Sequence, residues 1–461
     1  MAVEEGAGVP GGGRASTVKR AVFGAAFGNM VEWFDYASYG YLAATIAAVF
    51  FAPGNETAAL LGAYAVFAIS FVVRPIGGLV WGHYGDKVGR QRVLALTIIV
   101  MSLATFAIGF LPGHATIGIA APLLLLLCRL VQGFSASGEY AGASSFIAEY
   151  APANRRGLLV SMVPASTAAG LVLGATLASL LEYNLSQDAL YSWGWRIPFL
   201  IAGPLGVIGL YIRLKLEDTP AFRALEREHE VAQAPVLRTI RDNWRRILVA
   251  FGVICLNAVG FYMILSYMPT YLSEELGFDP VTAILTTIVS VSVYVLLLPF
   301  VGALADRVGR KPVMLGASVL FVLLTLPSFE LLSLGGVTYA ILAQVLLGAI
   351  LAGNDGVLAT FLTEMFPTTV RYTSFALSFN LGNAIFGGTA PFVATWLISL
   401  TGNNFAPGFY LMGAAVVAFV ALLFTTETAN RALQQEEAVG DVPIPEPEAS
   451  PSRITTTPSD R

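Results

Sequence analysis

Long apolar runs recur along this chain, and they constrain its fold more than any other feature. A helix needs about 20 apolar residues to cross the hydrocarbon core of a bilayer. Runs of that size begin near residues 21, 58, 93, 117, 158 and 196, and a second set begins near 247, 281, 313, 337, 373 and 405. Lipid offers the backbone no hydrogen-bond partner, so each run is expected to be helical. The sequence therefore predicts an all-α membrane protein with about twelve transmembrane helices.

The charge content agrees with such a fold and argues against other classes. Only 12% of the 461 residues are charged, whereas a soluble domain carries roughly a quarter. A sequence pI near 5.5 gives no support to a nucleic-acid partner. Cys128 and Cys255 lie in apolar runs without metal-ligand spacing, and no HExxH, GxSxG or histidine cluster is present. We therefore expect no metal, no cofactor and no enzyme activity, and the sequence gives no indication of the oligomeric state.

Lys and Arg are distributed unevenly among the connections between spans. The connections after spans 2, 4, 6, 8 and 10 all carry basic residues, and Arg213 is counted in the one after span 6. The alternate connections (APGNET, PGHATIG, EYNLSQDALYSWG, SEELGFDP, SFELLSLGGV and TGNNFAP) contain neither Lys nor Arg. Because basic residues stay on the cytoplasmic side, both termini are predicted to be cytoplasmic in a multi-pass protein of the cell (inner) membrane.

Composition shifts divide the chain into five parts. The glycine-rich start lacks the apolar core of a signal peptide, and residues 1–20 are predicted to be a disordered cytoplasmic leader. A polar, proline-rich tail over residues 428–461 is also predicted to be disordered. Between them we expect an N-terminal six-helix bundle (21–214), a cytoplasmic linker (215–246) and a C-terminal six-helix bundle (247–427).

Two junctions of the first bundle are repeated in the second. GHYGDKVGRQR lies between spans 2 and 3, and GALADRVGRKP lies between spans 8 and 9. EYAPANRRG follows span 4, and EMFPTTVRY follows span 10. The matched residues are Asp86, Gly89 and Arg90 with Asp306, Gly309 and Arg310, and Glu149, Pro152 and Arg156 with Glu364, Pro367 and Arg371. Parallel repeats of this kind are typical of carriers whose midplane site opens alternately to each side.

The repeated loop GxxxD(K/R)xGR(Q/K) resembles the signature loop of the major facilitator superfamily. GNMVEWFDYASYGY, FVVRPIGGLVWGHYGDKVGRQR and WGWRIPFLIAGPLGVIGLYIR resemble its metabolite:proton symporter family, over about residues 21–433. SYMPTYLSEELGF, EMFPTTVRYTSFALSFN and TETANRAL most resemble the osmoregulatory proline/glycine betaine transporters of that family. The resemblance implies two pseudo-symmetric six-helix bundles and import of a zwitterionic compatible solute by proton symport. Import of a carboxylate such as shikimate, citrate or a dicarboxylate is the alternative.

Several polar residues lie within the predicted spans, where a charge costs at least roughly 2.5–3.5 kcal/mol. They recur at helical spacing and so form stripes along single helix faces. The stripes are Asn29, Glu32, Asp35, Tyr36 and Tyr39 on span 1, Arg129, Gln132, Glu139 and Tyr140 on span 4, and Gln344 and Asp355 on span 10. In the family that the chain resembles, spans 1, 4, 7 and 10 line the central cavity. We therefore expect these residues to surround a watery cavity.

The cavity is expected to bind the solute through one cation and several rings. Arg129 can clamp a substrate carboxylate through paired hydrogen bonds, or it pairs permanently with Glu32 or Asp35. Arg74, placed near the cytoplasmic end of span 2, is expected to pair locally. Ring faces hold a quaternary ammonium well, and a single clear cation favours a zwitterion over a dicarboxylate. The predicted substrate-binding residues are Trp33, Tyr36, Tyr39, Arg129, Tyr140, Asn257 and Tyr262.

Proton coupling requires a group that gains and loses a proton during the cycle. His83, His114 and His229 all fall in predicted connections, so a buried carboxyl group is expected to carry the proton. The candidates are Glu32, Asp35, Glu139 and Asp355, of which Glu32 and Asp35 come first. A sodium site built from the same carboxylates stays open. Span 5 lacks the GPxxGG element of drug:proton antiporters, which favours symport.

The repeated loops are predicted to control opening. In the family, the loop acid binds near the start of a neighbouring helix, where free N–H groups favour an anion. Basic loop residues would add ion pairs that close the cytoplasmic side, whereas a purely topological basic loop would not need the repeated Gly and Asp. The predicted gating residues are Asp86, Arg90, Glu149, Arg156, Asp306, Arg310, Glu364 and Arg371.

Overall fold

The computed structural model describes residues 11–219, 222–223, 236–431 and 433, and their regular structure is helical. Most of the predicted leader and tail therefore lies outside the described residues. Residues 11–20 do not form a disordered leader, because helix α1 begins at Gly11. The predicted linker also ends earlier than expected, since α14 begins at Val236.

The first six spans form the N half. Its helices are α1 (Gly11–Tyr41), α2 (Ala43–Phe50), α3 (Glu56–Val72), α4 (Arg74–Val88), α5 (Arg90–Ile108), α6 (His114–Ile117), α7 (Ala120–Ala136), α8 (Glu139–Tyr150), α9 (Arg156–Val160), α10 (Met162–Asn184), α11 (Gln187–Ala189) and α12 (Arg196–Leu214). Short breaks split single spans into two labelled helices. α3 and α4 are one such pair, because Pro75 at the start of α4 lacks the N–H that would continue α3.

The last six spans form the C half. Its elements are α14 (Val236–Phe261), η3 (Tyr262–Tyr267), α15 (Met268–Thr270), η4 (Tyr271–Glu275), α16 (Pro280–Val308), α17 (Arg310–Ser333), α18 (Val337–Met365), α19 (Arg371–Gly382), η5 (Asn383–Gly387), α20 (Ala390–Thr401) and α21 (Ala406–Leu423). Among the described residues, eleven spans are long and apolar enough to cross a membrane. α1 is the twelfth, and its polar stripe explains why it falls below that hydropathy. The predicted fold class is therefore confirmed.

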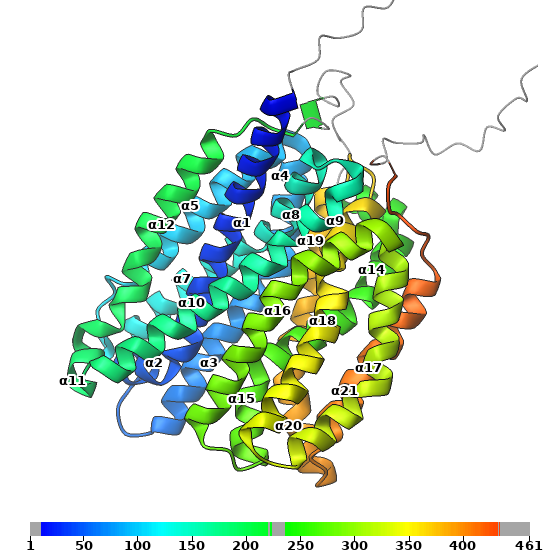
Figure 1. Cartoon of the computed structure of the whole chain (residues 1–461). Helices are drawn as coiled ribbons and strands as arrows, with labels where there is room; N and C mark the ends of the chain where they lie inside the picture. Colours follow the sequence, from blue (N-terminus) through cyan, green and yellow to red (C-terminus); the bar gives the residue numbers. More distant parts are fainter. Residues whose placement is uncertain (1–10, 220–221, 224–235, 432, 434–461) are drawn as a thin grey trace, which may run out of the picture.

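The two halves lie side by side, and both described chain ends lie at the same end of the molecule (Figure 1). We call that end the terminal face. α1 packs along α10 and α5 along α12, while α16 packs along α18 and α17 along α21. The halves meet where α4 contacts α19 and where α9 and α10 contact α16. Spans 2 and 5 of one half therefore face spans 11 and 8 of the other.

Glycine permits this close approach of the halves. A Cβ on Gly82 would lie 2.5 Å from Cα of Thr373, and one on Gly302 would lie 2.5 Å from the Gly157 carbonyl oxygen. Gly89 and Gly309, with φ of +106° and +115°, make the turns that follow α4 and α16. Such positive φ values suit glycine far better than other residues. The glycines of the repeated loops are thus explained by backbone geometry.

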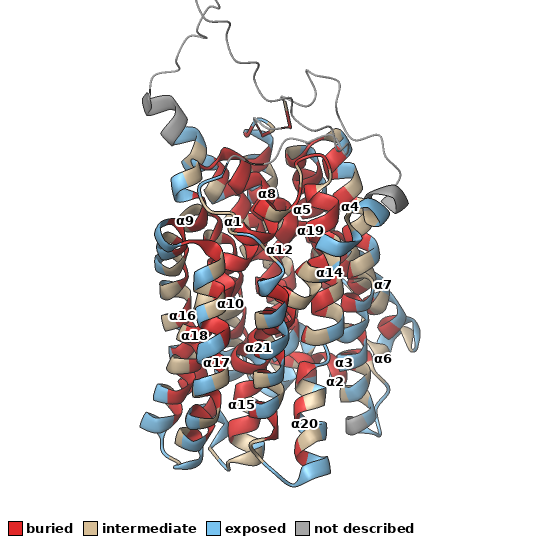
Figure 2. Ribbon diagram, turned by 90° about the vertical axis from the view of Figure 1, so that its right-hand side faces the viewer, coloured by how far each residue is buried: buried red, intermediate tan, exposed pale blue. Residues whose placement is uncertain are grey.

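Burial is inverted relative to a soluble protein. Large apolar side chains such as Val72, Phe300 and Phe392 are exposed, whereas Arg129 and Arg310 are fully enclosed. Figure 2 shows the buried residues in the interior of the bundle and along the contact between its helices. An apolar exterior around charged interior groups is the arrangement expected when lipid surrounds the protein.

Candidate functional site

The first buried ion pair joins Glu32 of α1 to Arg74 of α4. An Nη2–Oε1 distance of 3.0 Å connects the two side chains, and both are at least 95% buried. Arg74 lies midway along the span Ala58–Val88 rather than near its end. The placement near the cytoplasmic end was therefore wrong. The partner is also far away in sequence, so the pairing is not local.

Aromatic rings from both halves surround this pair. Cζ of Arg74 lies 4.6 Å from the ring centroids of both Tyr36 and Phe71, and 5.9 Å from that of Trp33. The Phe71 ring contacts Tyr262 of the C half at a centroid distance of 6.1 Å. The group, which we call the Arg74 cluster, consists of Glu32, Trp33, Tyr36, Phe71, Arg74, Phe261 and Tyr262.

The Arg74 cluster also contains buried polar atoms that lack a hydrogen-bond partner in the described part of the chain. They are Oε2 of Glu32, Nε1 of Trp33, Nε of Arg74 and the hydroxyl groups of Tyr36 and Tyr262. Buried polar groups are nearly always hydrogen-bonded, and each exception asks for an explanation. Donors and an acceptor gathered here suit a small ligand that carries both kinds of group.

A second ion pair joins Arg129 to Asp35 and stays within the N half. Nη1 of Arg129 lies 3.0 Å from Oδ2 of Asp35, and Nε2 of Gln132 donates to the same oxygen at 2.8 Å. Cζ of Arg129 lies 3.7 Å from the ring centroid of Tyr39, whose hydroxyl donates to the Ala63 carbonyl. This geometry favours the permanent ion pair over a solute clamp.

A third pair joins Glu139 of α8 to Arg213 of α12. Nη1 of Arg213 lies 2.9 Å from Oε2 of Glu139, and Thr97 donates to the same oxygen at 3.2 Å. Arg213 is only 2% exposed. Counting Arg213 in the connection after span 6 was therefore wrong. Its partner Glu139 belongs to the interior of the N half.

Asp355 of α18 has surroundings of another kind. Nδ2 of Asn257 donates to it at 2.9 Å, and the hydroxyl groups of Tyr294 and Tyr140 also donate, the latter at 3.5 Å. Tyr140 belongs to the N half, and its ring stacks on Phe379 at a centroid distance of 4.2 Å. Among the described residues, no Lys or Arg forms an ion pair with Asp355. Sequence reasoning missed Tyr294, although it is the tyrosine within the apolar run of span 8.

The loop acids bind helix starts in the opposite half. Asp86 accepts hydrogen bonds from the N–H groups of Tyr372 and Thr373, at 3.2 and 2.9 Å, where α19 begins. Asp306 accepts from the N–H groups of Gly157 and Leu158, at 2.8 and 2.9 Å, where α9 begins. The free N–H groups of a helix start stabilise an anion. The two pairs of hydrogen bonds are related by the internal repeat.

Ion pairs across the halves surround these contacts. Arg371 lies 2.6 Å from Glu149, and Arg156 lies 2.8 Å from Glu364. Arg90 and Arg310 add pairs to the same two glutamates within their own halves, at 3.5 and 3.2 Å. All eight predicted gating residues thus meet near the terminal face, and we call them the latch.

A third repeated element supports the latch, and sequence reasoning missed it. Asp218 accepts from the Arg90 N–H at 3.2 Å, and Thr219 donates to Glu149 at 2.5 Å. In the C half, Glu427 accepts from the Arg310 N–H at 2.9 Å, and Thr428 donates to Glu364 at 2.6 Å. The signal was an acid followed by threonine just after each bundle. Because Thr428 makes one of these bonds, the tail that was predicted to be disordered from residue 428 begins too early.

The two acids of this element differ electrostatically. Burial raises the pKa of Asp218, although the Thr219 N–H and Arg90 oppose that rise. Burial also acts on Glu427, but N–H groups of Ala429, Arg310 and Lys311 outweigh it, so its pKa lies below the ordinary value. Glu427 is therefore the stronger anionic cap for a helix start.

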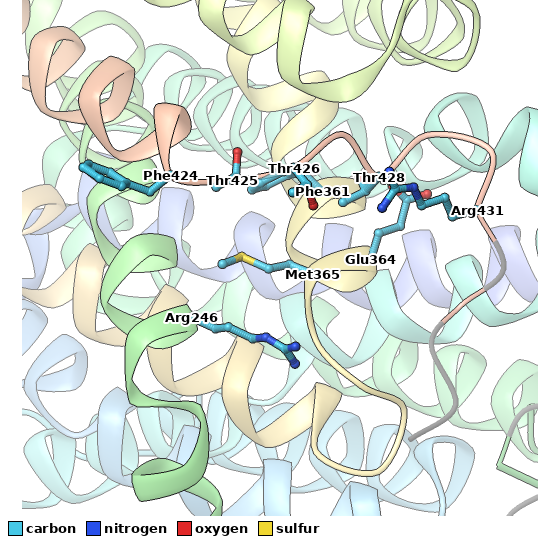
Figure 3. Close-up of a pocket in the computed structure, with 9 residues that line it drawn as sticks. All are labelled: Arg246, Phe361, Glu364, Met365, Phe424, Thr425, Thr426, Thr428 and Arg431. Carbon is cyan, nitrogen blue, oxygen red and sulfur yellow. Dashed lines mark hydrogen bonds between the residues drawn. The ribbon is translucent and has the colours of Figure 1, made fainter. Parts of the chain in front are cut away.

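A pocket with about 740 Å³ of open space lies beside the latch. It is lined by Arg246 of α14, by Glu364 and Met365 of α18, and by the segment that follows α21, including Thr428 and Arg431 (Figure 3). The pocket belongs to the latch region and not to the Arg74 cluster. Among the described residues, no group of three or more His, Cys, Asp or Glu side chains is arranged to hold a metal ion.

Comparisons with known proteins identify the family. A model described as "Sugar (and other) transporter" matches residues 21–243, and one described as "Major Facilitator Superfamily" matches residues 251–455. A glycine betaine/proline/ectoine/pipecolic acid transporter of Dickeya dadantii is 40% identical over 426 residues, which cover 90% of this chain and 85% of the relative. The chain belongs to the major facilitator superfamily.

Two other relatives and one solved structure are similar to this transporter over most of its length. A proline/betaine transporter of Escherichia coli K12 is 40% identical, over 90% of this chain and 85% of its own. An ectoine/proline transporter of Corynebacterium glutamicum is 37% identical over the same shares. A solved proton:xylose symporter bound to 6-bromo-6-deoxy-D-glucose matches with a TM-score of 0.78 at 18% identity, over 91% of this chain and 98% of that one. The last likeness concerns the fold alone.

Proposed function

We propose that this transporter imports a small zwitterionic compatible solute, such as proline or glycine betaine, by proton symport with alternating access. The observation that carries the proposal is the Arg74 cluster, which combines one guanidinium, one carboxylate and several ring faces. The relatives are transporters of betaine, proline and ectoine, which supports the same solute class.

The two ends of a zwitterion suit different members of the cluster. A solute carboxylate would bind Arg74, whose planar guanidinium offers paired donors and whose Nε is without a partner among the described residues. The cationic end would bind near Glu32 and the ring faces of Trp33 and Tyr36, because rings attract onium groups. A dicarboxylate or citrate would leave one carboxylate beside Glu32, which is unfavourable. Carboxylate import is therefore the weaker alternative.

The positions of the cluster residues support alternating access. Trp33 and Tyr36 belong to the N half, whereas Phe261 and Tyr262 belong to the C half. A solute between them would contact both halves and would be released when the halves separate on one side. Binding energy at such an interface favours the closed arrangement, which is the basis of solute-dependent switching.

Orientation and gating complete the proposal. The basic residues in the connections indicate that the terminal face is on the cytoplasmic side of the cell membrane, so both termini would lie in the cytoplasm. The latch would then close the cytoplasmic side, because Glu149 with Arg371 and Glu364 with Arg156 join the two halves there. Opening toward the cytoplasm requires both cross-half pairs to separate. Of the four predicted proton carriers, Glu32, Asp35 and Glu139 are held in ion pairs, which leaves Asp355.

Uptake into proteoliposomes tests the function. Purified protein is expected to accumulate labelled glycine betaine or proline under an imposed inward proton gradient. Unlabelled proline, betaine and ectoine should compete, whereas shikimate and citrate should not. A sodium gradient at constant pH is the control for the coupling ion, and protein-free liposomes are the control for leakage. Accumulation of labelled citrate or shikimate under the same gradient, without accumulation of betaine or proline, would reject the zwitterion in favour of a carboxylate.

A further inference from the structure

Asp355 differs from every other buried mid-span acid in its partners. Glu32, Asp35 and Glu139 each face an arginine of the N half. Asp355 is 3% exposed and accepts hydrogen bonds only from neutral donors among the described residues, namely Asn257, Tyr294 and Tyr140. Protonating an ion-paired acid would strand a buried arginine. Protonating Asp355 strands no charge.

One of the three donors links Asp355 to the other half. Asn257 and Tyr294 belong to the C half and hold the carboxyl from α14 and α16. Tyr140 belongs to α8 and reaches Asp355 from the N half, in the longest of the three contacts at 3.5 Å. The position of Tyr140 is fixed by its stacking on Phe379 of α19. Asp355 therefore lies on the contact that must loosen when the halves move apart.

We propose that Asp355 carries the coupled proton and that its hydrogen bond with Tyr140 ties protonation to contact between the halves. This inference rests on the proposed symport. The ionised carboxylate accepts from Tyr140 and so holds the halves together at mid-span. When an O–H bond forms on the carboxyl with a proton from outside, Tyr140 loses its anionic acceptor and the latch side opens. There the O–H bond breaks, the proton passes to cytoplasmic water, and the carboxylate again accepts from Tyr140.

Few groups around Asp355 can gain or lose a proton. The titratable groups that face it from the packed elements are Tyr140 on α8 and Tyr294 on α16, while α14 contributes the amide of Asn257. Neutral tyrosine titrates far above physiological pH. The carboxyl group is thus the member of this set with the lowest ordinary pKa, and it is the one that can alternate between a charged and a neutral form without ionising a hydroxyl group.

A cysteine that reports opening of the latch side tests the switch without any solute. Ser161 is 1% exposed and lies against Gly302, between the halves. In a background with Cys128 and Cys255 replaced by alanine, S161C is labelled with a maleimide between about pH 5 and pH 8. Labelling of N154C, at an exposed position on the same face, corrects for the intrinsic pH dependence of thiol reactivity.

Corrected labelling in the parent is expected to rise several-fold as pH falls. In D355N it should be high and independent of pH. Y140F should weaken the pH response, whereas the control variant Y271F, which removes a hydroxyl that donates to the Asn404 carbonyl and not to Asp355, should keep it. A parent without a pH response, or a D355N variant that keeps the parent's response, would overturn the proposal. Y140F decides the same question if D355N does not yield a monodisperse protein.

Transport gives a second readout. Liposomes that contain the parent protein and a pH-sensitive dye should record proton entry with glycine betaine. D355N should exchange labelled for unlabelled betaine but should neither accumulate it under a proton gradient nor carry protons. Gradient-driven accumulation by D355N would reject Asp355 as the carrier. A parent that moves neither betaine nor proline would reject the proposed solute, while the cysteine labelling would still decide the role of Asp355.

Discussion

The two halves share one latch but differ in their buried acids. At the terminal face, Asp86 and Asp306 bind equivalent helix starts, and each cross-half glutamate pairs with an equivalent arginine. Inside, the N half holds three acid–arginine pairs, whereas the C half holds Asp355 with neutral donors. Surfaces that close on one another can stay symmetric. The proposed roles of the interior, with a solute at the Arg74 cluster and a proton on Asp355, would not be symmetric.

Within the N half, the ion pairs of Arg129 and Arg74 also differ in their surroundings. The Arg129 pair is enclosed by residues of its own half, while the Arg74 pair faces rings of both halves. Removing one member of a buried ion pair costs stability. Only the Arg74 pair is placed to lose affinity for a solute as well. The following predictions test these contrasts, beginning with the largest effect.

Loss of Arg129 should cost the most stability. R129Q leaves Asp35 buried without its cation, which costs about 3–5 kcal/mol. D35N combined with R129Q should recover part of that loss, because no buried charge remains. D355N, which strands no cation, should cost much less. Thermal unfolding of the detergent-solubilised protein measures all three, and equal losses for R129Q and D355N would contradict the contrast between the halves.

Loss of Arg74 should weaken solute binding in addition to the stability that is lost when Glu32 is left without its cation. A hydrogen bond to a charged group contributes about 1.5–3 kcal/mol, so R74Q should raise the Kd for glycine betaine by about 10- to 150-fold. Quenching of Trp33 fluorescence on titration with betaine measures the Kd. R196Q is the matched control, because Arg196 lies outside the cluster, where it donates to the Gly109 and Leu111 carbonyl groups and lies 4.5 Å from the Trp195 ring centroid. Unchanged affinity in R74Q would place the solute elsewhere.

The latch should respond symmetrically. E149Q and E364Q each remove the acid of one cross-half ion pair, so each should increase labelling of S161C from the terminal face by a similar factor. The double variant should label more than either single variant, because both pairs hold the same contact. A large effect of one glutamate and none of the other would show that the repeat is symmetric in geometry but not in energy.

Glu427 and Asp218, which accept from the N–H groups at helix starts, should have the smallest effects on stability, and the pH dependence of the two effects should be opposite. Because the pKa of Glu427 is lowered in the folded state, its carboxylate stabilises the fold at pH values above the ordinary glutamate pKa of about 4.3. That stabilisation is lost as pH falls through the lowered pKa. The pKa of Asp218 is raised, so Asp218 stabilises the fold at low pH, and that stabilisation is lost as pH rises above the ordinary aspartate pKa of about 3.9. At neutral pH, E427Q should therefore lower the unfolding temperature, whereas D218N should not. Equal decreases in both variants would contradict the pKa difference.

The sequence by itself determined the number of spans, their order and the two-fold repeat. Hydrophobic length sets where helices cross a bilayer, and this signal needs no knowledge of neighbouring helices. It also singled out most of the charged residues that lie buried, including Glu32, Asp35, Asp355 and the latch. The helical start of α1 at Gly11 escaped it, because a glycine-rich stretch carries no apolar periodicity.

Only the tertiary structure decided which buried groups are partners. Glu32 pairs with Arg74 and not with Arg129, Glu139 pairs with Arg213, and Asp355 is bound by Tyr294. Spacing along one helix fixes a face, but the partner depends on how each helix is rotated and on which spans are neighbours. The proposed roles differ for the same reason: an acid held by an arginine stays charged, because its protonation would strand that arginine, whereas protonation of an acid held by hydroxyl groups and an amide strands no charge.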